Sequence, residues 1–204
     1  MGAGERPVRL GFLASRNGSS MAAMLDAITA GTLRATGAIG ISNNRGAAAF
    51  SYASAHNVPV AHVSRTRYGD EADVRMADLL AEHGAELIVL SGYMRKLGPV
   101  TLERFAGRIL NIHPSLLPKF GGQGMYGRHV HEAVIAAGEQ ETGISVHLVT
   151  PEYDQGPVLA QTTVPVLAGD TADRLEARVR GLEPAFYVDV LRGIVDGEIK
   201  LPTE

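Results

Sequence analysis

The chain has 204 residues, of which 45% are hydrophobic, and its formal charge of −3 arises from 19 basic and 22 acidic residues. A nearly balanced chain without a basic block gives no electrostatic case for binding nucleic acid, and the hydrophobic share excludes a disordered chain. There are no cysteines, so disulfides, thiolate metal sites and cysteine nucleophiles are excluded.

The polar leader that precedes residue 8 does not have the form of a signal peptide, and no apolar run is long enough to cross a bilayer. A cysteine-free chain also fits a reducing compartment. We therefore expect a cytoplasmic protein that acts on small molecules, without a nucleic-acid or membrane partner.

Strand-like and helix-like segments alternate through the first half of the chain. Short apolar runs predict strands at residues 8–14, 36–42, 59–63 and 87–90, and helical spacing predicts helices from residue 21, over 45–56 and over 70–83. Ser19 or Ser20 is placed to cap the first helix. This alternation predicts right-handed βαβ units, a parallel sheet covered on both faces, and a ligand site at the carboxyl ends of the strands.

The second half has a different order of elements. Strands are expected at residues 109–112, 144–150 and 158–166, and the last two should pair antiparallel because only a short loop separates them. Thr171 is expected to cap a final helix, which Pro184 should interrupt or kink. Without a repeat or a linker, we expect one domain over residues 1–204. Its fold class is α/β, with a mixed, mainly parallel sheet and antiparallel strands in the carboxyl-terminal half.

The loop Asn17-Gly18-Ser19-Ser20 lies between the first strand and the first helix. Its glycine allows close approach of a ligand, and its hydroxyls and the helix N-terminus favour a phosphate. It is neither a Walker loop nor the GxGxxG fingerprint of dinucleotide-binding oxidoreductases. An ordinary capped turn explains the same residues equally well.

A second segment, Asn111-Ile-His113-Pro-Ser-Leu-Leu-Pro118, places an amide and an imidazole two residues apart. On a strand these side chains point to the same side, where they could stabilise an oxyanion and move a proton. Asp154 lies on a Gly-Pro loop and could orient His113, or could simply form a turn. A histidine hydrogen-bonded inside the core is the plainer interpretation of His113.

These segments together resemble the glycinamide ribonucleotide (phosphoribosylglycinamide, GAR) formyltransferases of the folate-dependent formyltransferase superfamily. The resemblance rests on Asn111–Phe120 and on Gly143–Thr150 continuing to Asp154 and Pro157, and it extends over nearly the whole chain. The opening Asn-Gly-Ser-Ser loop and two further segments, 93–97 and 177–183, follow in the family's order.

The resemblance implies a three-layer Rossmann-like fold whose half at residues 7–100 binds phosphate and whose half at 101–204 supplies folate-binding and catalytic elements. It implies transfer of a formyl group from 10-formyltetrahydrofolate to GAR in purine (IMP) synthesis, with no metal and with a homodimer as the family's expectation. The implied catalytic residues are Asn111, protonated His113 and Asp154.

The implied binding residues fall into two sets. The phosphoribosyl substrate would contact Gly18, Ser19, Ser20 and Glu183, and the folate would contact Met94, Arg95, Leu97, Val149 and Thr150. Arg16, Ser20 and Arg180 depart from the common family pattern, and the Gly121–Gly127 loop is unusually rich in glycine. The alternatives are a formyltransferase for another amine, such as a nucleotide-linked amino sugar, and a non-catalytic relative that binds phosphate or folate.

Overall fold

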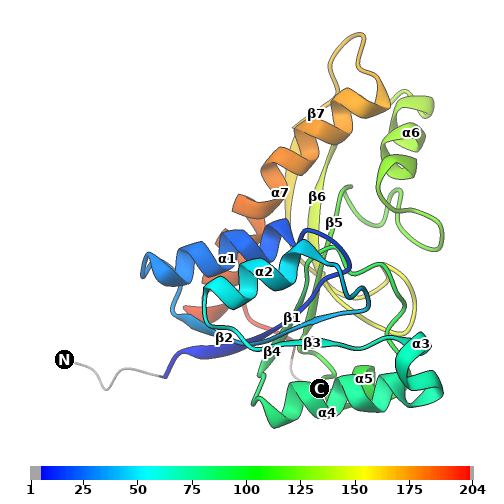
Figure 1. Ribbon diagram of the computed structural model, residues 1–204. Coiled ribbons are helices and arrows are strands. Elements are labelled where there is room, and N and C mark those ends of the chain that lie inside the picture. Colours follow the sequence, from blue (N-terminus) through cyan, green and yellow to red (C-terminus); the bar gives the residue numbers. More distant parts are fainter. Residues whose placement is uncertain (1–5, 203–204) are drawn as a thin grey trace.

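A computed structural model describes residues 6–202, which form a seven-stranded sheet with helices on both faces (Figure 1). Its strands are β1 (Val8–Leu13), β2 (Ala35–Ser42), β3 (Val60–His62), β4 (Leu87–Leu90), β5 (Ile109–His113), β6 (Glu141–Leu148) and β7 (Val158–Pro165). The order in the sheet is β3-β2-β1-β4-β5-β6-β7. The first five pair in parallel, and β6 pairs antiparallel with both β5 and β7. The expected α/β fold with a mixed, mainly parallel sheet is confirmed.

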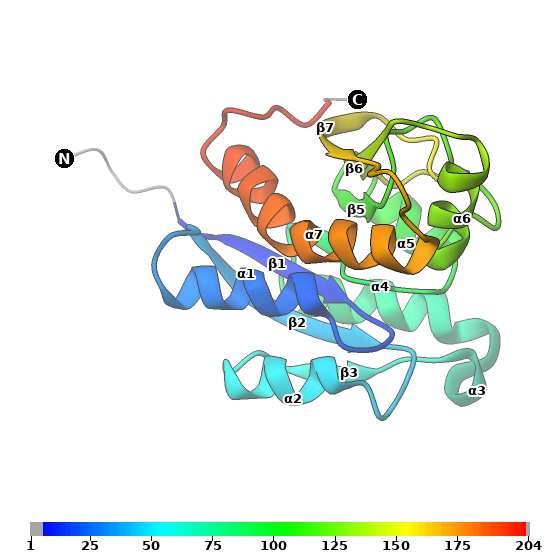
Figure 2. The same cartoon turned by 90° about the horizontal axis from the view of Figure 1, so that it is seen from above.

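The helices cover the sheet in two layers. They are α1 (Ser19–Thr29), α2 (Ala48–Ala55), α3 (Arg65–Tyr68), the 3₁₀ helix η1 (Gly69–Glu71), α4 (Ala72–Glu82), α5 (Pro99–Arg104), α6 (Arg128–Ala136) and α7 (Ala172–Val195). Helices α1, α2 and α7 pack on one face, and α4 and α5 pack on the other (Figures 1 and 2). Within residues 6–202, no helix is both long and apolar enough to span a membrane.

The central strand β4 is apolar along its whole length because both of its faces are buried. In β4, Leu87 and Val89 belong to the core beneath α1 and α7, and Ile88 and Leu90 belong to the core beneath α4. A third cluster, which includes Val134 of α6, packs α6 and α7 over the β6–β7 hairpin. The two halves of the chain therefore share one sheet and one pair of covering layers.

The prediction that Ser19 or Ser20 caps the first helix is wrong. Gly18 is the N-cap, in the left-handed conformation at φ 64°, and no side chain caps this end. Glycine adopts that conformation without the steric cost of a Cβ atom, so the helix begins directly after it and the serines fall inside its first turn.

Other boundaries also differ from the predictions. The helix expected over 70–83 begins with the 3₁₀ turn η1, the helix expected from residue 45 begins at Ala48, and α3, α5 and α6 were not predicted as elements. These three helices have four to nine residues, which is too short for a clear periodic pattern in the sequence.

Helix α7 continues through Pro184 instead of ending there. Its N-cap is Thr171, as predicted, and the Thr171 hydroxyl accepts from the N–H of Arg174 at 3.4 Å. Proline removes one intrahelical hydrogen bond and crowds the preceding turn. Figure 2 shows the consequence, a bend between the orange and red parts of the helix, so the kink is confirmed and the interruption is not.

Candidate active site

Two serine side chains connect the loops at the carboxyl ends of the parallel strands. The Ser15 hydroxyl donates to Asn43 Oδ1 at 2.6 Å and accepts from the N–H of Met94 at 2.8 Å. Ser91 accepts from the N–H of Met21, in the first turn of α1, at 3.0 Å. The loops after β1, β2 and β4 are therefore held in one frame, at the edge where ligands bind in such sheets.

The loop at Gly18–Ser20 has the features of an anion site. Gly18 is buried, and a Cβ atom there would lie 3.0 Å from the Ala49 side chain. Ser19 is exposed and Ser20 is buried, and neither hydroxyl is bonded to another described residue. The first N–H groups of α1 have no acceptor within the helix, so the loop offers N–H and O–H donors at the positive end of the helix dipole.

The register of the sheet brings a polar cluster together on β5 and β6. Asn111 and His113 point to the same face of β5, and His147 of β6 pairs directly with Asn111. The Asn111 Nδ2 atom lies 3.1 Å from His147 Nε2. The prediction that the amide and the imidazole share one side of a strand end is confirmed, and a second imidazole joins them.

The loop between β6 and β7 brings Asp154 to this cluster. Its two carboxylate oxygens lie 3.5 Å from His113 Nδ1 and 3.5 Å from His147 Nε2, respectively. The N–H of Gly122 donates to the same carboxylate at 2.9 Å. Asp154 is held in the left-handed conformation at φ 55°, which places its backbone in a tight turn. The fold thus unites the three side chains that the resemblance named as catalytic.

The hydrogen bonds determine where the imidazole protons lie. His147 Nδ1 is 2.9 Å from the Leu148 carbonyl and so carries a hydrogen, which leaves Nε2 to accept from the Asn111 amide. His113 Nε2 is 2.8 Å from the Phe120 carbonyl, and because a carbonyl oxygen can only accept, this nitrogen also carries a hydrogen. The Asn111 amide retains a second N–H for another acceptor.

Burial and charge act in opposite directions on these groups. Burial lowers the pKa of His113 below its ordinary value, although Asp154 and the Phe120 carbonyl partly raise it. The resting imidazole is therefore neutral at neutral pH, where the resemblance implied a protonated ring. Burial raises the pKa of Asp154, but contacts with His147, His113 and the Gly122 N–H outweigh burial and lower it. Asp154 is accordingly ionised beside a neutral His113.

Glu183 lies on α7 without a partner among the described residues, and its carboxylate is half-buried. Burial raises its pKa, Arg180 lowers it, and Glu176 raises it further. The Arg180 guanidinium lies 3.4 Å from Glu176, one turn back along the helix. The Glu183 carboxylate can therefore still accept hydrogen bonds. Within residues 6–202, no hydrogen bond or ion pair connects Glu183 to Asp154, and none connects Gly18–Ser20 to Asp154.

The five residues expected to contact folate differ in how exposed their side chains are. Met94 is 52% exposed and Arg95 is exposed, so both are open to a ligand. Leu97 and Val149 pack in the core beneath α4, which explains their apolar side chains without a ligand. Thr150 is half-buried and donates to the Glu152 carbonyl at 3.2 Å.

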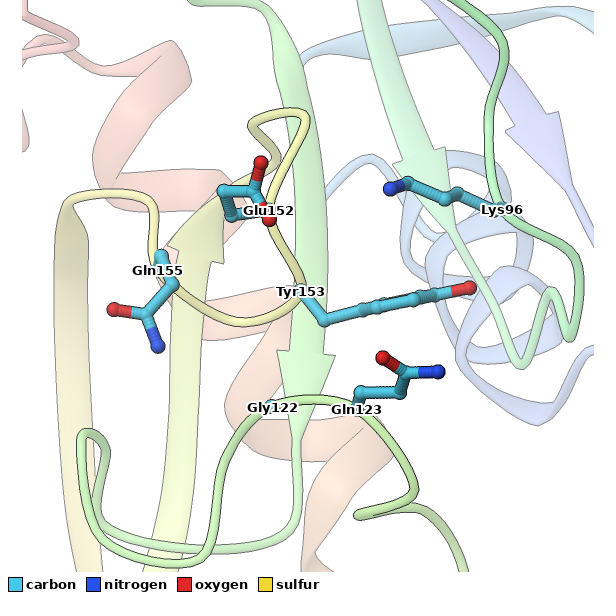
Figure 3. Close-up of a pocket in the computed structure, with 6 residues that line it drawn as sticks. All are labelled: Lys96, Gly122, Gln123, Glu152, Tyr153 and Gln155. Atoms are coloured by element: carbon cyan, nitrogen blue, oxygen red, sulfur yellow. The ribbon is translucent and has the colours of Figure 1, made fainter.

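A cavity of about 390 Å³ lies beside the polar cluster (Figure 3). It is lined by Lys96, Gly122, Gln123, Glu152, Tyr153 and Gln155. It adjoins Asp154 because Tyr153 and Gln155 flank that residue and the Gly122 N–H is bonded to it. The sequence drew attention to the segments that contain most of these residues, but it gave these side chains no role, because they come from three loops that only the fold assembles.

His129 and His131 do not form a metal pair. His129 is exposed and lies 3.5 Å from Glu132, whereas His131 is fully buried, as expected of residues two apart on a helix. Among residues 6–202, no group of three or more histidine, aspartate or glutamate side chains is arranged to hold a metal ion.

Comparison with known proteins identifies similar chains along nearly the full length. A formyl transferase family model matches residues 8–191. Phosphoribosylglycinamide formyltransferase of Escherichia coli K12 is 38% identical over 193 residues, covering 93% of this chain and 88% of the relative. The enzyme of the same name from Mycobacterium tuberculosis is 40% identical over 184 residues, covering 89% and 82%. The crystal structure of glycinamide ribonucleotide transformylase 1 from Symbiobacterium toebii superposes with a TM-score of 0.87 at 32% identity, covering 97% and 95%.

Proposed function

This chain belongs to the formyl transferase family, and we propose that it transfers the formyl group of 10-formyltetrahydrofolate to the amine of GAR. The products are N-formyl-GAR and tetrahydrofolate, in the de novo synthesis of purines. The observation that carries the proposal is the buried Asn111–His147–Asp154–His113 cluster, because it combines an amide donor, a neutral base and a carboxylate at one point. Similarity to named GAR formyltransferases over nearly the whole chain supports the choice of acceptor.

The acceptor is oriented by both of its ends. Its phosphate binds the N–H and hydroxyl donors of Gly18–Ser20 at the start of α1. The unpartnered Glu183 carboxylate accepts hydrogen bonds from the ribose or the glycinamide. Two fixed ends leave the amine little freedom, which lowers the entropic part of the barrier.

The chemistry proceeds by attack of the amine nitrogen on the formyl carbon. The carbonyl oxygen becomes an oxyanion, which the free N–H of Asn111 stabilises. Neutral His113 takes a proton from the attacking nitrogen at Nδ1, the ring nitrogen that carries no hydrogen, and the adjacent Asp154 stabilises the resulting imidazolium. Collapse of the intermediate breaks the bond to the folate N10, and the His113 imidazolium returns its proton to N10 as tetrahydrofolate leaves.

His113 can keep its bond to Phe120 during this sequence. Its Nε2–H is bonded to the Phe120 carbonyl and Nδ1 is the nitrogen without a hydrogen, so the proton arrives at Nδ1 and the Nε2–H bond holds the ring in place. Phe120 is in the left-handed conformation at φ 56° and directly precedes Gly121–Gly127.

The folate approaches from the β4 side of the cluster. Met94 and Arg95 are exposed to it, Leu97 and Val149 form the apolar base beneath, and Thr150 borders the β6–β7 loop. The cavity beside Asp154 fits an extended ligand that passes the catalytic residues. We place the reaction in the cytoplasm, the compartment that a cysteine-free chain fits, and the homodimer that the resemblance implies stays a prediction.

The acceptor is tested by steady-state assays with 10-formyltetrahydrofolate and three acceptors: GAR, a nucleotide-linked amino sugar, and water. We expect rapid transfer to GAR and negligible transfer to the other two. Transfer to the amino sugar alone, or release of formate, would retain the chemistry and reject GAR. No transfer to any acceptor would favour a non-catalytic binding protein.

A further inference from the structure

Three polar residues lie side by side across the last three strands of the sheet. His113 of β5 pairs with Ser145 of β6, and Ser145 pairs in turn with Gln161 of β7. Residues that pair directly across antiparallel strands project from the same face of the sheet. Ser145 is fully buried, whereas Gln161 is exposed on the edge strand. This row therefore extends from the proposed base to the edge of the sheet.

The Ser145 hydroxyl connects the row to the turn that follows His113. It accepts from the N–H of Leu117 at 3.0 Å and donates to the Ser115 carbonyl at 2.6 Å. Gln161 Nε2 donates to the same hydroxyl at 2.8 Å and to the Leu117 carbonyl at 3.0 Å. Both backbone polar groups of Leu117 are thus bonded to this pair of side chains.

The far end of the same turn holds the His113 ring. The Phe120 carbonyl accepts from His113 Nε2–H at 2.8 Å. The Leu117 side chain packs against Gly121, where a Cβ atom would lie only 2.5 Å from Leu117 Cδ2. Leu117 therefore contacts the chain directly after the carbonyl that orients the ring, and contacts lead without a break from Ser145 to His113.

We propose that Ser145 and Gln161 are positioning residues for the His113 ring. They fix the turn that presents the Phe120 carbonyl, and this carbonyl keeps the hydrogen on Nε2 and leaves Nδ1 to take the proton. The inference rests on the proposed function, because that function makes His113 the base. Ser145 is buried, so water cannot replace its hydrogen bonds when a partner is removed, and the turn loses its fixed geometry.

The first test is Gln161→Met, which keeps the length of the side chain and removes both of its donated hydrogen bonds. Gln161 is exposed, so this change should leave the fold intact, which thermal melting checks. We expect kcat for GAR to fall about three- to tenfold, the range for the loss of one or two hydrogen bonds, with the KM for GAR unchanged. Thr163→Val is the matched control, since Thr163 is exposed on the same face of β7 and its hydroxyl has no partner among the described residues; it should leave kcat unchanged.

The second test changes the hydroxyl at the centre of the network. Ser145→Ala leaves the N–H of Leu117 without its acceptor and should lower kcat at least about tenfold, again with the KM for GAR unchanged. Ser145→Thr retains a hydroxyl and should recover most of the loss. Recovery by threonine separates the loss of the hydrogen bonds from a general loss of packing.

Heteronuclear NMR of the histidine rings gives a readout that does not depend on GAR. In the wild type, the His113 signals, assigned by their absence in His113→Gln, should be those of the Nε2–H tautomer. The bond to the Phe120 carbonyl raises the pKa of His113, so Gln161→Met should lower that pKa and mix the two tautomers. The other titratable groups that act on this ring are unchanged in the variant; they are Asp154, His147 and His131.

The inference would be overturned if Gln161→Met and Ser145→Ala kept the wild-type kcat, or if kcat fell while the tautomer and the pKa of His113 stayed the same. A rise in the KM for GAR with kcat unchanged would also overturn it. If the wild type did not formylate GAR, the proposed function would fail, and the NMR measurement would then decide by itself whether the two side chains position the ring.

Discussion

At the scale of single residues, the site depends on a polar cluster that is almost removed from water. His113 and His147 are buried, and each nitrogen of their rings lies near a protein oxygen or the Asn111 amide. Polar groups in such surroundings lose much free energy when a partner is removed. We therefore propose that His147 is a positioning residue, because it lies within hydrogen-bonding distance of Asn111 and 3.5 Å from Asp154.

His147→Leu should lower kcat about ten- to a hundredfold with little change in the KM for GAR, because the oxyanion donor is misplaced while the phosphate loop is intact. His147→Gln, whose amide oxygen can accept from Asn111, should recover part of the loss. Steady-state kinetics of both variants, with thermal melting to confirm folding, would measure this. A rise in KM without a change in kcat would contradict the positioning role.

Sequence reasoning predicted part of this cluster. The two-residue spacing of Asn111 and His113 was sufficient to place both on one side of a strand. Asp154 could be connected to them only through the family resemblance, because no local pattern joins residues 113 and 154. The role of His147 depends on its pairing with Asn111 across β5 and β6, and a strand register cannot be read from one strand alone.

At the scale of elements, the β6–β7 hairpin holds Asp154, the proposed catalytic carboxylate. Gly156 lies where this loop folds back, and a Cβ atom there would lie 1.8 Å from the Leu148 carbonyl oxygen. Only glycine permits so close an approach of two backbone segments. The hairpin thus fixes the loop that carries Asp154.

Gly156→Ala should lower the free energy of unfolding by about 2–4 kcal/mol, the range of severe steric substitutions, and should also reduce turnover. Gly181→Ala is the matched change in α7, where a Cβ would meet nothing within 4 Å. It should stabilise the protein by about 0.5–1 kcal/mol. Urea denaturation of both variants measures the difference, and equal effects would show that the backbone contact at Gly156 is unimportant.

The elements that sequence reasoning identified are those with strong periodic patterns. The apolar strands β1 and β4 and the helix α4 were predicted within a few residues. The short helices α3, α5 and α6 were missed because four to nine residues carry too little periodicity. The first helix was given the wrong cap because serine is the commoner N-cap, whereas here a left-handed glycine precedes it.

At the scale of the whole molecule, one sheet connects the phosphate loop to the catalytic cluster. Helix α1 carries the proposed phosphate donors, α7 carries Glu183, and the two helices pack in the same core. The strand order places β4, which precedes the proposed folate-binding residues Met94 and Arg95, between β1 and β5. In the proposed reaction each substrate contacts parts of both halves, and the central claim is that the two substrates react at His113 and Asp154.

The measurement that tests this claim most directly is the pH dependence of kcat/KM for wild type and Asp154→Asn, with GAR affinity determined separately. Since burial lowers the pKa of His113, the acid limb of the wild-type profile should lie below pH 6.5, because the base works only when it is neutral. Asp154 raises that pKa, so its neutralisation should move the limb to still lower pH. It should also reduce kcat at least about a hundredfold and leave GAR affinity nearly unchanged. The account would be contradicted if Asp154→Asn retained turnover and the acid limb of its pH profile did not move. It would also be contradicted if this variant lost GAR binding while its turnover stayed intact.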